Sequence, residues 1–262
     1  MTEAETMNPR ARPCGPVGLA FSLAGIGVLA VLLLALALAA AAGIDALVNG
    51  TGHLSGVFGS LSDLSGRLSD PTGRRADDVL MAVFSLGSAV YLAAALAILL
   101  VARWRGGADW RELLGWRSFT TDGGYWTRVA GAVAYGLLAG FVVLKLNPEA
   151  KDWLVLPRGG IALLSIFVLA VVMAPLAEEL LFRGWIYTSL RVRLGAGATI
   201  GITGVLFALA HWERTHLYAL AVLPVGLLLG YARERSGSVR ATILMHGIYN
   251  CSALVAKILF PD

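Results

Sequence analysis

Charged side chains are scarce in this sequence. They make up 15% of its 262 residues, against roughly 25% in a soluble domain, and hydrophobic residues make up 57%. The mean hydropathy is +0.73. This composition excludes an ordinary soluble enzyme and indicates a polytopic membrane protein.

Cysteine is also scarce. Cys14 and Cys251 are too few and too far apart for a disulfide framework. Cys14 follows Arg12 and Pro13, without the apolar approach of a lipoprotein cleavage site. Neither cysteine has an obvious partner base, and no segment resembles the sharp turn that carries a catalytic serine. We therefore expect two ordinary thiols.

A continuous basic stripe is missing, although the net charge is +4. The arginines lie between apolar runs, which argues against a nucleic-acid partner and for topology determinants. With the amino terminus inside, the inner segments hold 12 basic residues and the outer ones 8, Arg183 lying within a span. The inner ones are Arg10, Arg12, Arg103, Arg105, Arg111, Arg117, Arg128, Arg191, Arg193, Arg233, Arg235 and Arg240. Together with the excess of arginine over lysine and the abundant alanine, this predicts a bacterial cytoplasmic membrane protein with its amino terminus in the cytoplasm.

Long apolar runs are what the chain does have. They predict an all-α fold, a polytopic transmembrane helix bundle of about seven (six to eight) helices, in a single membrane domain (17–262) after a polar tail (1–16). The predicted spans are 17–43, 79–103, 125–146, 161–187, 198–212, 217–232 and 240–260. The first is too long for the core of a signal peptide. In the connection 44–77, leucines spaced by three or four residues predict a weak amphipathic helix on the membrane surface, with a loop as the alternative.

Three charges interrupt the run 161–187. A charge at the centre of a membrane helix costs about 2.5–3.5 kcal/mol on insertion scales. The presence of Glu178, Glu179 and Arg183 in this span therefore calls for a structural or functional explanation. Glu179 and Arg183 are i,i+4 neighbours and can pair, either to lock the helix against its neighbours or as part of a site. Glu178 points about 100° away and is free to face something else. Pro175, one turn earlier, would loosen the backbone there.

Polar residues of two other spans reach a similar depth. At 1.5 Å per residue, Glu178 and His211 lie ~20 Å from the inner boundary, Asn250 lies ~15 Å from it, and His246 is one turn shallower on the face of Asn250. A carboxylate, two imidazoles and a carboxamide suffice for hydrolysis without a covalent intermediate. Glu178 with His211 would activate water, and His246 with Asn250 would stabilise the oxyanion.

A metal site is the competing interpretation, because Glu178, His211 and His246 are all zinc-ligand types. His211 and His216 resemble a zincin motif only superficially, since i,i+5 residues are about 140° apart on a helix. We expect His216 at the membrane interface. Taken singly, each intramembrane histidine or asparagine also fits a simple interhelical hydrogen bond.

Three motifs resemble those of the CPBP family, which includes type II CAAX prenyl endopeptidases and bacterial bacteriocin-processing and self-immunity proteins. They are Glu-Glu-x-x-x-Arg at Glu178–Arg183, Phe-x-x-x-His at Phe207–His211 and His-x-x-x-Asn at His246–Asn250. Each is unspecific alone, but three in this order on three predicted membrane spans are a strong signal. The resemblance covers roughly 160–255.

The resemblance implies an intramembrane glutamic endopeptidase that needs no metal or other cofactor. It implies catalytic roles for Glu178, His211, His246 and Asn250, with Glu179, Arg183 and Phe207 in support. The expected partners are the lipid bilayer and a peptide or membrane-protein substrate; prenylated CAAX proteins do not carry over, because they are eukaryotic. The alternatives are a non-hydrolytic immunity or peptide-binding protein using the same polar pocket, and a metal-dependent variant of the protease.

Overall fold

The computed structural model describes residues 15–49, 74–148, 156–212 and 216–260, and every regular element among them is helical. The first half contributes α2 (Pro16–Asn49), α5 (Arg74–Gly106), the short η2 (Gly107–Asp109) and α6 (Trp110–Leu114), and α7 (Gly123–Leu146). The second half contributes one long helical run (Gly160–Arg191), α11 (Ala196–Ala210), α12 (Leu217–Ser236) and α13 (Val239–Leu259). The predicted all-α membrane bundle is confirmed.

The long run is not a uniform α-helix. It passes through α8 (Gly160–Phe167), the π-helical η4 (Val168–Met173), α9 (Ala174–Glu179), the π-helical η5 (Leu180–Ile186) and α10 (Tyr187–Arg191). The two acids therefore lie on a short α-helical segment with a widened turn on each side. π-Helical turns inside α-helices are frequent at functional sites.

The predicted spans agree with the observed helices, except that one of them is too short to be a full membrane crossing. Six helices in the described residues are long and apolar enough to cross a membrane. The seventh, α11, has 15 residues and is ~22 Å long, short of the ~30 Å hydrocarbon thickness, so it is not a full crossing by its own length. It packs as a hairpin against α12. The predicted surface helix in 44–77 and the tail before residue 15 lie outside the described residues.

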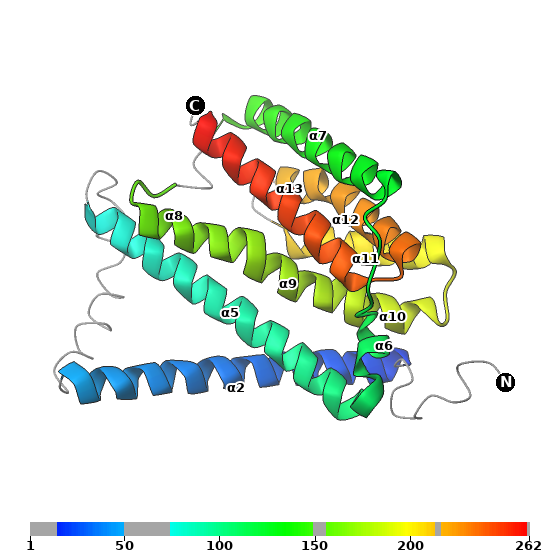
Figure 1. Ribbon diagram of the computed structural model, residues 1–262, viewed down its shortest axis with the longest axis horizontal. Helices are drawn as coiled ribbons and strands as arrows, with labels where there is room; N and C mark the ends of the chain where they lie inside the picture. The colour runs from blue at the N-terminus through cyan, green and yellow to red at the C-terminus, as the bar shows by residue number, and fades with distance from the viewer. Residues whose placement is uncertain (1–14, 50–73, 149–155, 213–215, 261–262) are drawn as a thin grey trace.

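Helices α2 and α7 lie at opposite edges of the bundle, with α5, the long run and α13 between them (Figure 1). Helix α2 packs mainly on α5, and α5 packs along α8, η4 and α9. Helix α13 packs on η4, α9, α7 and α12. Two of the motif-bearing helices, the long run and α13, are therefore inner ones.

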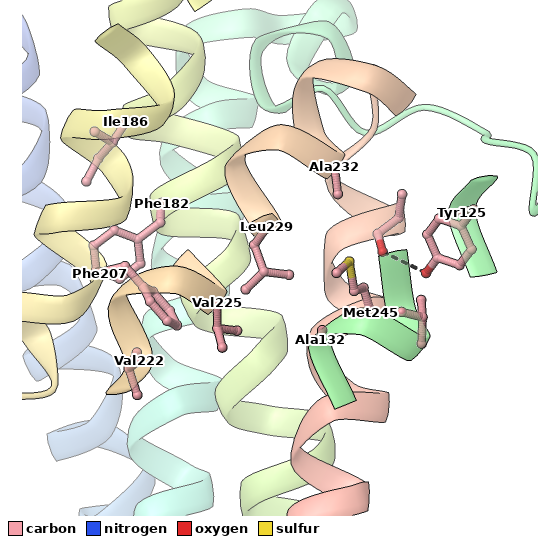
Figure 2. Packing of buried hydrophobic residues seen from close by; sticks show 12 residues of the cluster. Tyr125, Ala132, Phe182, Ile186, Phe207, Val222, Val225, Leu229, Ala232 and Met245 are labelled. Atoms are coloured by element: carbon pink, nitrogen blue, oxygen red, sulfur yellow. Dashed lines mark hydrogen bonds between the residues drawn. The ribbon is translucent and has the colours of Figure 1, made fainter. Parts of the chain in front are cut away.

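A buried cluster packs η5, α11, α12 and α13 against one another and against α7 (Figure 2). Phe182 of η5 meets Phe207 of α11 edge to face, with ring centroids 5.3 Å apart. The Tyr125 hydroxyl of α7 donates a hydrogen bond of 3.0 Å to the Ala241 carbonyl of α13. Because Phe207 is one turn before His211, this packing also sets the position of that histidine.

One end of the bundle is held together by contacts between helix ends. The Val239 N–H donates to the Gly115 carbonyl (2.9 Å), and Arg191 pairs with Glu234 at 3.0 Å. Gly115 ends α6 with a φ of +63°, and a Cβ there would overlap the guanidinium of Arg233. Only glycine satisfies both constraints.

We expect Gly115→Ala to destabilise the protein by about 2–4 kcal/mol, because it combines left-handed strain with a steric overlap. Gly107→Ala is the matched control: its φ is +56°, but no atom lies within 4 Å of the added Cβ. The control should be destabilised only by the left-handed backbone strain, by about 1 kcal/mol. Thermal unfolding of both variants in detergent measures the difference, and equal losses would contradict a steric role for Arg233.

Candidate active site

Four polar side chains of the predicted motifs line one cavity of about 220 Å³. They are Glu178 of α9, His211 at the end of α11, and His246 and Asn250 of α13. The remaining wall is largely aromatic and aliphatic. It is formed by Tyr91, Leu169, Ala170, Ala174, Phe207, Tyr218, Val222, Val225 and Tyr249. The structure therefore brings together side chains from three motifs that are distant in sequence.

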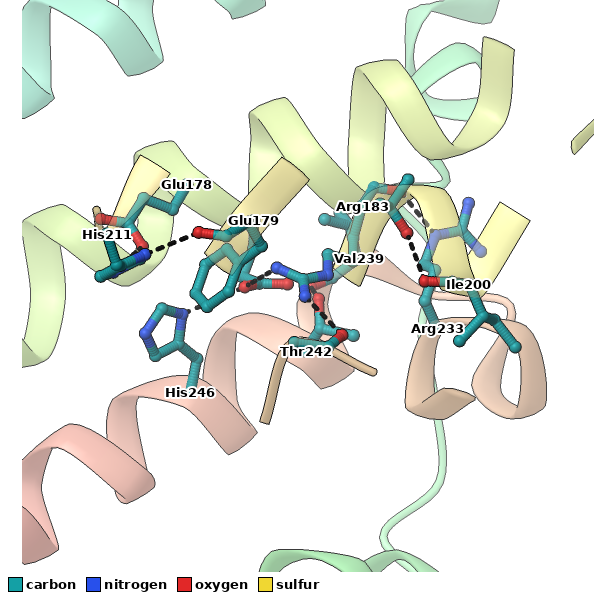
Figure 3. Close-up of polar contacts among 12 residues, drawn as sticks. Glu178, Glu179, Arg183, Ile200, His211, Arg233, Val239, Thr242 and His246 are labelled. Carbon is teal, nitrogen blue, oxygen red and sulfur yellow. Dashed lines mark hydrogen bonds and ion pairs between the residues drawn. The ribbon is translucent and has the colours of Figure 1, made fainter. Parts of the chain in front are cut away.

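The two adjacent acids have different environments. Glu179 is fully buried, and its Oε1 accepts hydrogen bonds from Arg183 Nη1 (2.9 Å) and His246 Nδ1 (3.0 Å) (Figure 3). Arg183 is also fully buried, and its Nη2 donates to the Gly226 carbonyl of α12 (2.7 Å). Its guanidinium carbon lies 4.4 Å from the centroid of the Phe207 ring, a cation–π distance. This pair ties α9 and η5 to α11, α12 and α13.

Glu178 has one bonded and one unbonded oxygen. Its Oε1 accepts a hydrogen bond of 3.0 Å from the Tyr91 hydroxyl of α5. Its Oε2 is buried, has no hydrogen-bond partner, and lies 3.9 Å from His211 Nε2. That separation is too long for a direct hydrogen bond. Glu179 Oε2 is also buried without a hydrogen-bond partner, but Glu179 does not line the cavity. The position of the unbonded Glu178 oxygen beside the cavity and His211 marks it as a functional candidate.

The hydrogen-bond partners determine which nitrogen of each histidine carries a proton. His211 ends α11, and its Nδ1 lies 2.8 Å from the Phe207 carbonyl. Because a carbonyl only accepts, Nδ1 carries the hydrogen, and in the neutral ring Nε2 presents a lone pair toward Glu178. By the same reasoning, the Nδ1 of His246 donates to the Glu179 carboxylate, which leaves Nε2 available to the cavity.

Asn250 bonds to a carbonyl of η4. Its Nδ2 donates to the Ala170 oxygen (2.8 Å), and Pro175, five residues after Ala170, has no N–H with which to close that i→i+5 bond. The helices approach closely here, because a Cβ on Gly247 would lie 3.0 Å from the Val171 oxygen. The carboxamide of Asn250 keeps a second N–H hydrogen.

Sequence reasoning missed the tyrosines of the cavity. Tyr91 lies in an apolar span 87 residues before Glu178, and no spacing rule connects them. Tyr218 and Tyr249 lie on α12 and α13. His216 does not line the cavity; its ring stacks on Trp212 at a centroid distance of 4.0 Å. Across the described ranges, no group of three His, Cys, Asp or Glu residues is arranged to hold a metal ion.

Comparisons with known proteins agree with the predicted resemblance. Residues 160–252 match the family described as type II CAAX prenyl endopeptidase Rce1-like, a protease family, and this region contains all three motifs. An uncharacterized 24.3 kDa protein of Escherichia coli is 42% identical over 89 residues, which are 33% of this chain and 39% of that protein. The alignment thus spans well under half of that relative. No solved structure matches the chain significantly.

Proposed function

We propose that this integral membrane protein is an intramembrane endopeptidase. It would hydrolyse a peptide bond in a membrane-associated protein or peptide, using water activated by Glu178 and His211. One observation carries the proposal: the unbonded Oε2 of Glu178 lies 3.9 Å from the lone-pair nitrogen of His211. Both atoms are acceptors, so a water between them would donate one hydrogen to each and present its own lone pairs to a substrate.

The first chemical step is attack by this water on the scissile carbonyl carbon. The new C–O bond forms while the water proton moves to Glu178 Oε2, and the carbonyl electrons move onto its oxygen. Collapse of this intermediate breaks the C–N bond, and the proton held by Glu178 passes to the leaving nitrogen. A single carboxyl group therefore serves as general base and then as general acid. The Phe207 carbonyl keeps His211 in the tautomer that this step needs.

His246 and Asn250 are our candidates for stabilising the oxyanion. Both line the cavity, and Asn250 has one N–H hydrogen left after its bond to Ala170. His246 donates to the Glu179 carboxylate from Nδ1 at 3.0 Å, and it would donate to the oxyanion from Nε2 when both ring nitrogens carry hydrogen. Glu179, Arg183 and Phe207 would support the site by holding His246 and His211 in place.

The direct test compares peptide termini in membranes of cells that produce the wild-type protein or Glu178→Gln at equal levels. Termini that disappear in the variant identify the cleavage site and the substrate together. A variant that retains full cellular function would contradict hydrolysis. That outcome would favour a non-hydrolytic immunity or peptide-binding protein.

We also propose that the protein resides in a bacterial cytoplasmic membrane with its amino terminus inside. The end of the bundle where α6, α10, α12 and α13 meet is rich in arginine, as a cytoplasmic face would be. We expect a cysteine in place of the exposed Ser118, on this face, to react with a membrane-impermeant maleimide only after lysis. Labelling of this cysteine in intact spheroplasts would contradict the proposed orientation and indicate the opposite one.

A further inference from the structure

Tyr91 is the residue through which α5 contacts the candidate site. Its hydroxyl donates to Glu178 Oε1 at 3.0 Å, and its side chain lines the cavity. It lies outside the region 160–252 that matches the protease family. The first three membrane helices therefore do not only surround the motif-bearing helices, since one of them supplies a direct contact to the central carboxylate.

We propose that Tyr91 is a positioning residue that holds one oxygen of Glu178 and so orients the carboxylate with its other oxygen facing His211. This inference deepens the proposed function and rests on it for the role of Oε2. The terminal torsion of a glutamate is soft and broad, so the plane of an unrestrained carboxylate would sample many orientations. A hydroxyl on one oxygen removes that freedom, and hydrogen bonds to an ionised acceptor are stronger than neutral ones.

Helix α5 packs closely on the long helical run next to this contact. Gly87 is one turn before Tyr91 on the same face of α5, and a Cβ there would lie 3.2 Å from the Leu169 side chain of η4. The glycine thus permits the close approach of α5 to the long helical run that places the phenol beside Glu178. The wider turn of η4 lies next to this contact and ends immediately before α9.

Another tyrosine of the bundle provides a matched comparison. Tyr135 of α7 also forms an interhelical hydrogen bond of 3.0 Å, but its acceptor is the backbone carbonyl of Ala221. Tyr135 does not line the cavity. Tyr91→Phe and Tyr135→Phe therefore remove the same group and the same kind of contact, and only the first removes a donor from the carboxylate.

The experiment measures both variants in two ways. The first is the rate at which Glu178-dependent peptide termini accumulate at equal protein level. We expect a fall of about 10–100-fold for Tyr91→Phe, the range for losing one hydrogen bond to a charged group, and less than about 2-fold for Tyr135→Phe. The melting temperatures of the two variants should agree within a few degrees.

The second measurement does not need a substrate. Dicyclohexylcarbodiimide modifies carboxyl groups within membrane proteins, and mass spectrometry quantifies its adduct on Glu178. We expect more adduct in Tyr91→Phe than in the wild type, because the carboxylate oxygen that the hydroxyl held is then free to react with the reagent, and no change in Tyr135→Phe. Equal adduct levels in the two variants would overturn the proposal, as would equal losses of cleavage.

The two measurements separate this inference from the proposed function. If no peptide terminus depends on Glu178, the endopeptidase proposal fails. The adduct level would then still decide whether Tyr91 controls the carboxylate. If termini depend on Glu178 but neither measurement responds to Tyr91→Phe, the endopeptidase proposal stands and the role of Tyr91 is overturned.

Discussion

Replacing Glu178 by Gln is expected to lower the rate of peptide hydrolysis by about 10²–10⁴-fold, the usual contribution of a general base, without destabilising the protein. The amide oxygen of glutamine still accepts from Tyr91, so the contact on Oε1 is retained. The other oxygen has no hydrogen-bond partner to lose, and an amide N–H in its place faces the lone pair of His211. What disappears is the capacity to take a proton. The measurement is turnover of a peptide spanning the mapped cleavage site by purified protein in liposomes, with melting temperature alongside.

A chelator distinguishes this chemistry from the metal-dependent alternative on the same preparation. We expect 1,10-phenanthroline to leave the wild-type rate unchanged, because the derived steps use only protein groups and water. Loss of activity that zinc restores would instead assign Glu178, His211 and His246 as ligands. In that case the loss of activity in Glu178→Gln would reflect loss of metal, which metal analysis of the purified variant would show.

Removing Arg183 is expected to give the largest loss of stability. Arg183→Met leaves the fully buried Glu179 without its main counter-charge, and breaking a buried ion pair from one side costs about 3–5 kcal/mol. It also removes the bond to the Gly226 carbonyl and the contact with the Phe207 ring. We expect a strongly lowered melting temperature and reduced yield of folded protein, measured by thermal unfolding in detergent.

Two further variants test whether the uncompensated buried charge of Glu179 causes the loss of stability in Arg183→Met. The double variant Glu179→Gln/Arg183→Met carries neither charge and should unfold at a higher temperature than Arg183→Met alone. Arg191→Met removes a partly exposed pair with Glu234 and should change stability much less. A double variant no more stable than Arg183→Met would show that packing, rather than uncompensated charge, dominates the loss.

The adjacent glutamates are therefore expected to fail in different ways when replaced. One residue of helical rotation turns Glu178 into the cavity and Glu179 into a network of buried donors. Replacing Glu178 should lower activity and leave stability normal. Breaking the Glu179–Arg183 pair should lower stability. The i,i+4 spacing predicted the Glu179–Arg183 pair, and the structure confirms that contact.

Several contacts at the site were not accessible to sequence reasoning. The motifs predicted that Glu178, His211, His246 and Asn250 would meet, but not that His246 donates to Glu179 or that Asn250 donates to Ala170. The π-helical turns on both sides of the acids leave no compositional signature, because they depend on which carbonyls the neighbouring helices satisfy. Pro175 was a partial signal, since its missing N–H leaves a carbonyl of the preceding turn unbonded.

The sequence by itself determined the membrane-helix fold, the approximate spans, and the resemblance of the motif-bearing region to a known family, because long apolar runs and fixed motif spacings are local properties of a chain. Only the tertiary structure decided which contacts each acid makes. Whether a carboxylate oxygen is bonded, and by which donor, depends on side chains that helix packing brings together, such as a tyrosine 87 residues earlier. The physical reason is that a hydrogen bond requires an atom within about 3 Å, and that proximity is set by packing between helices and not by sequence spacing.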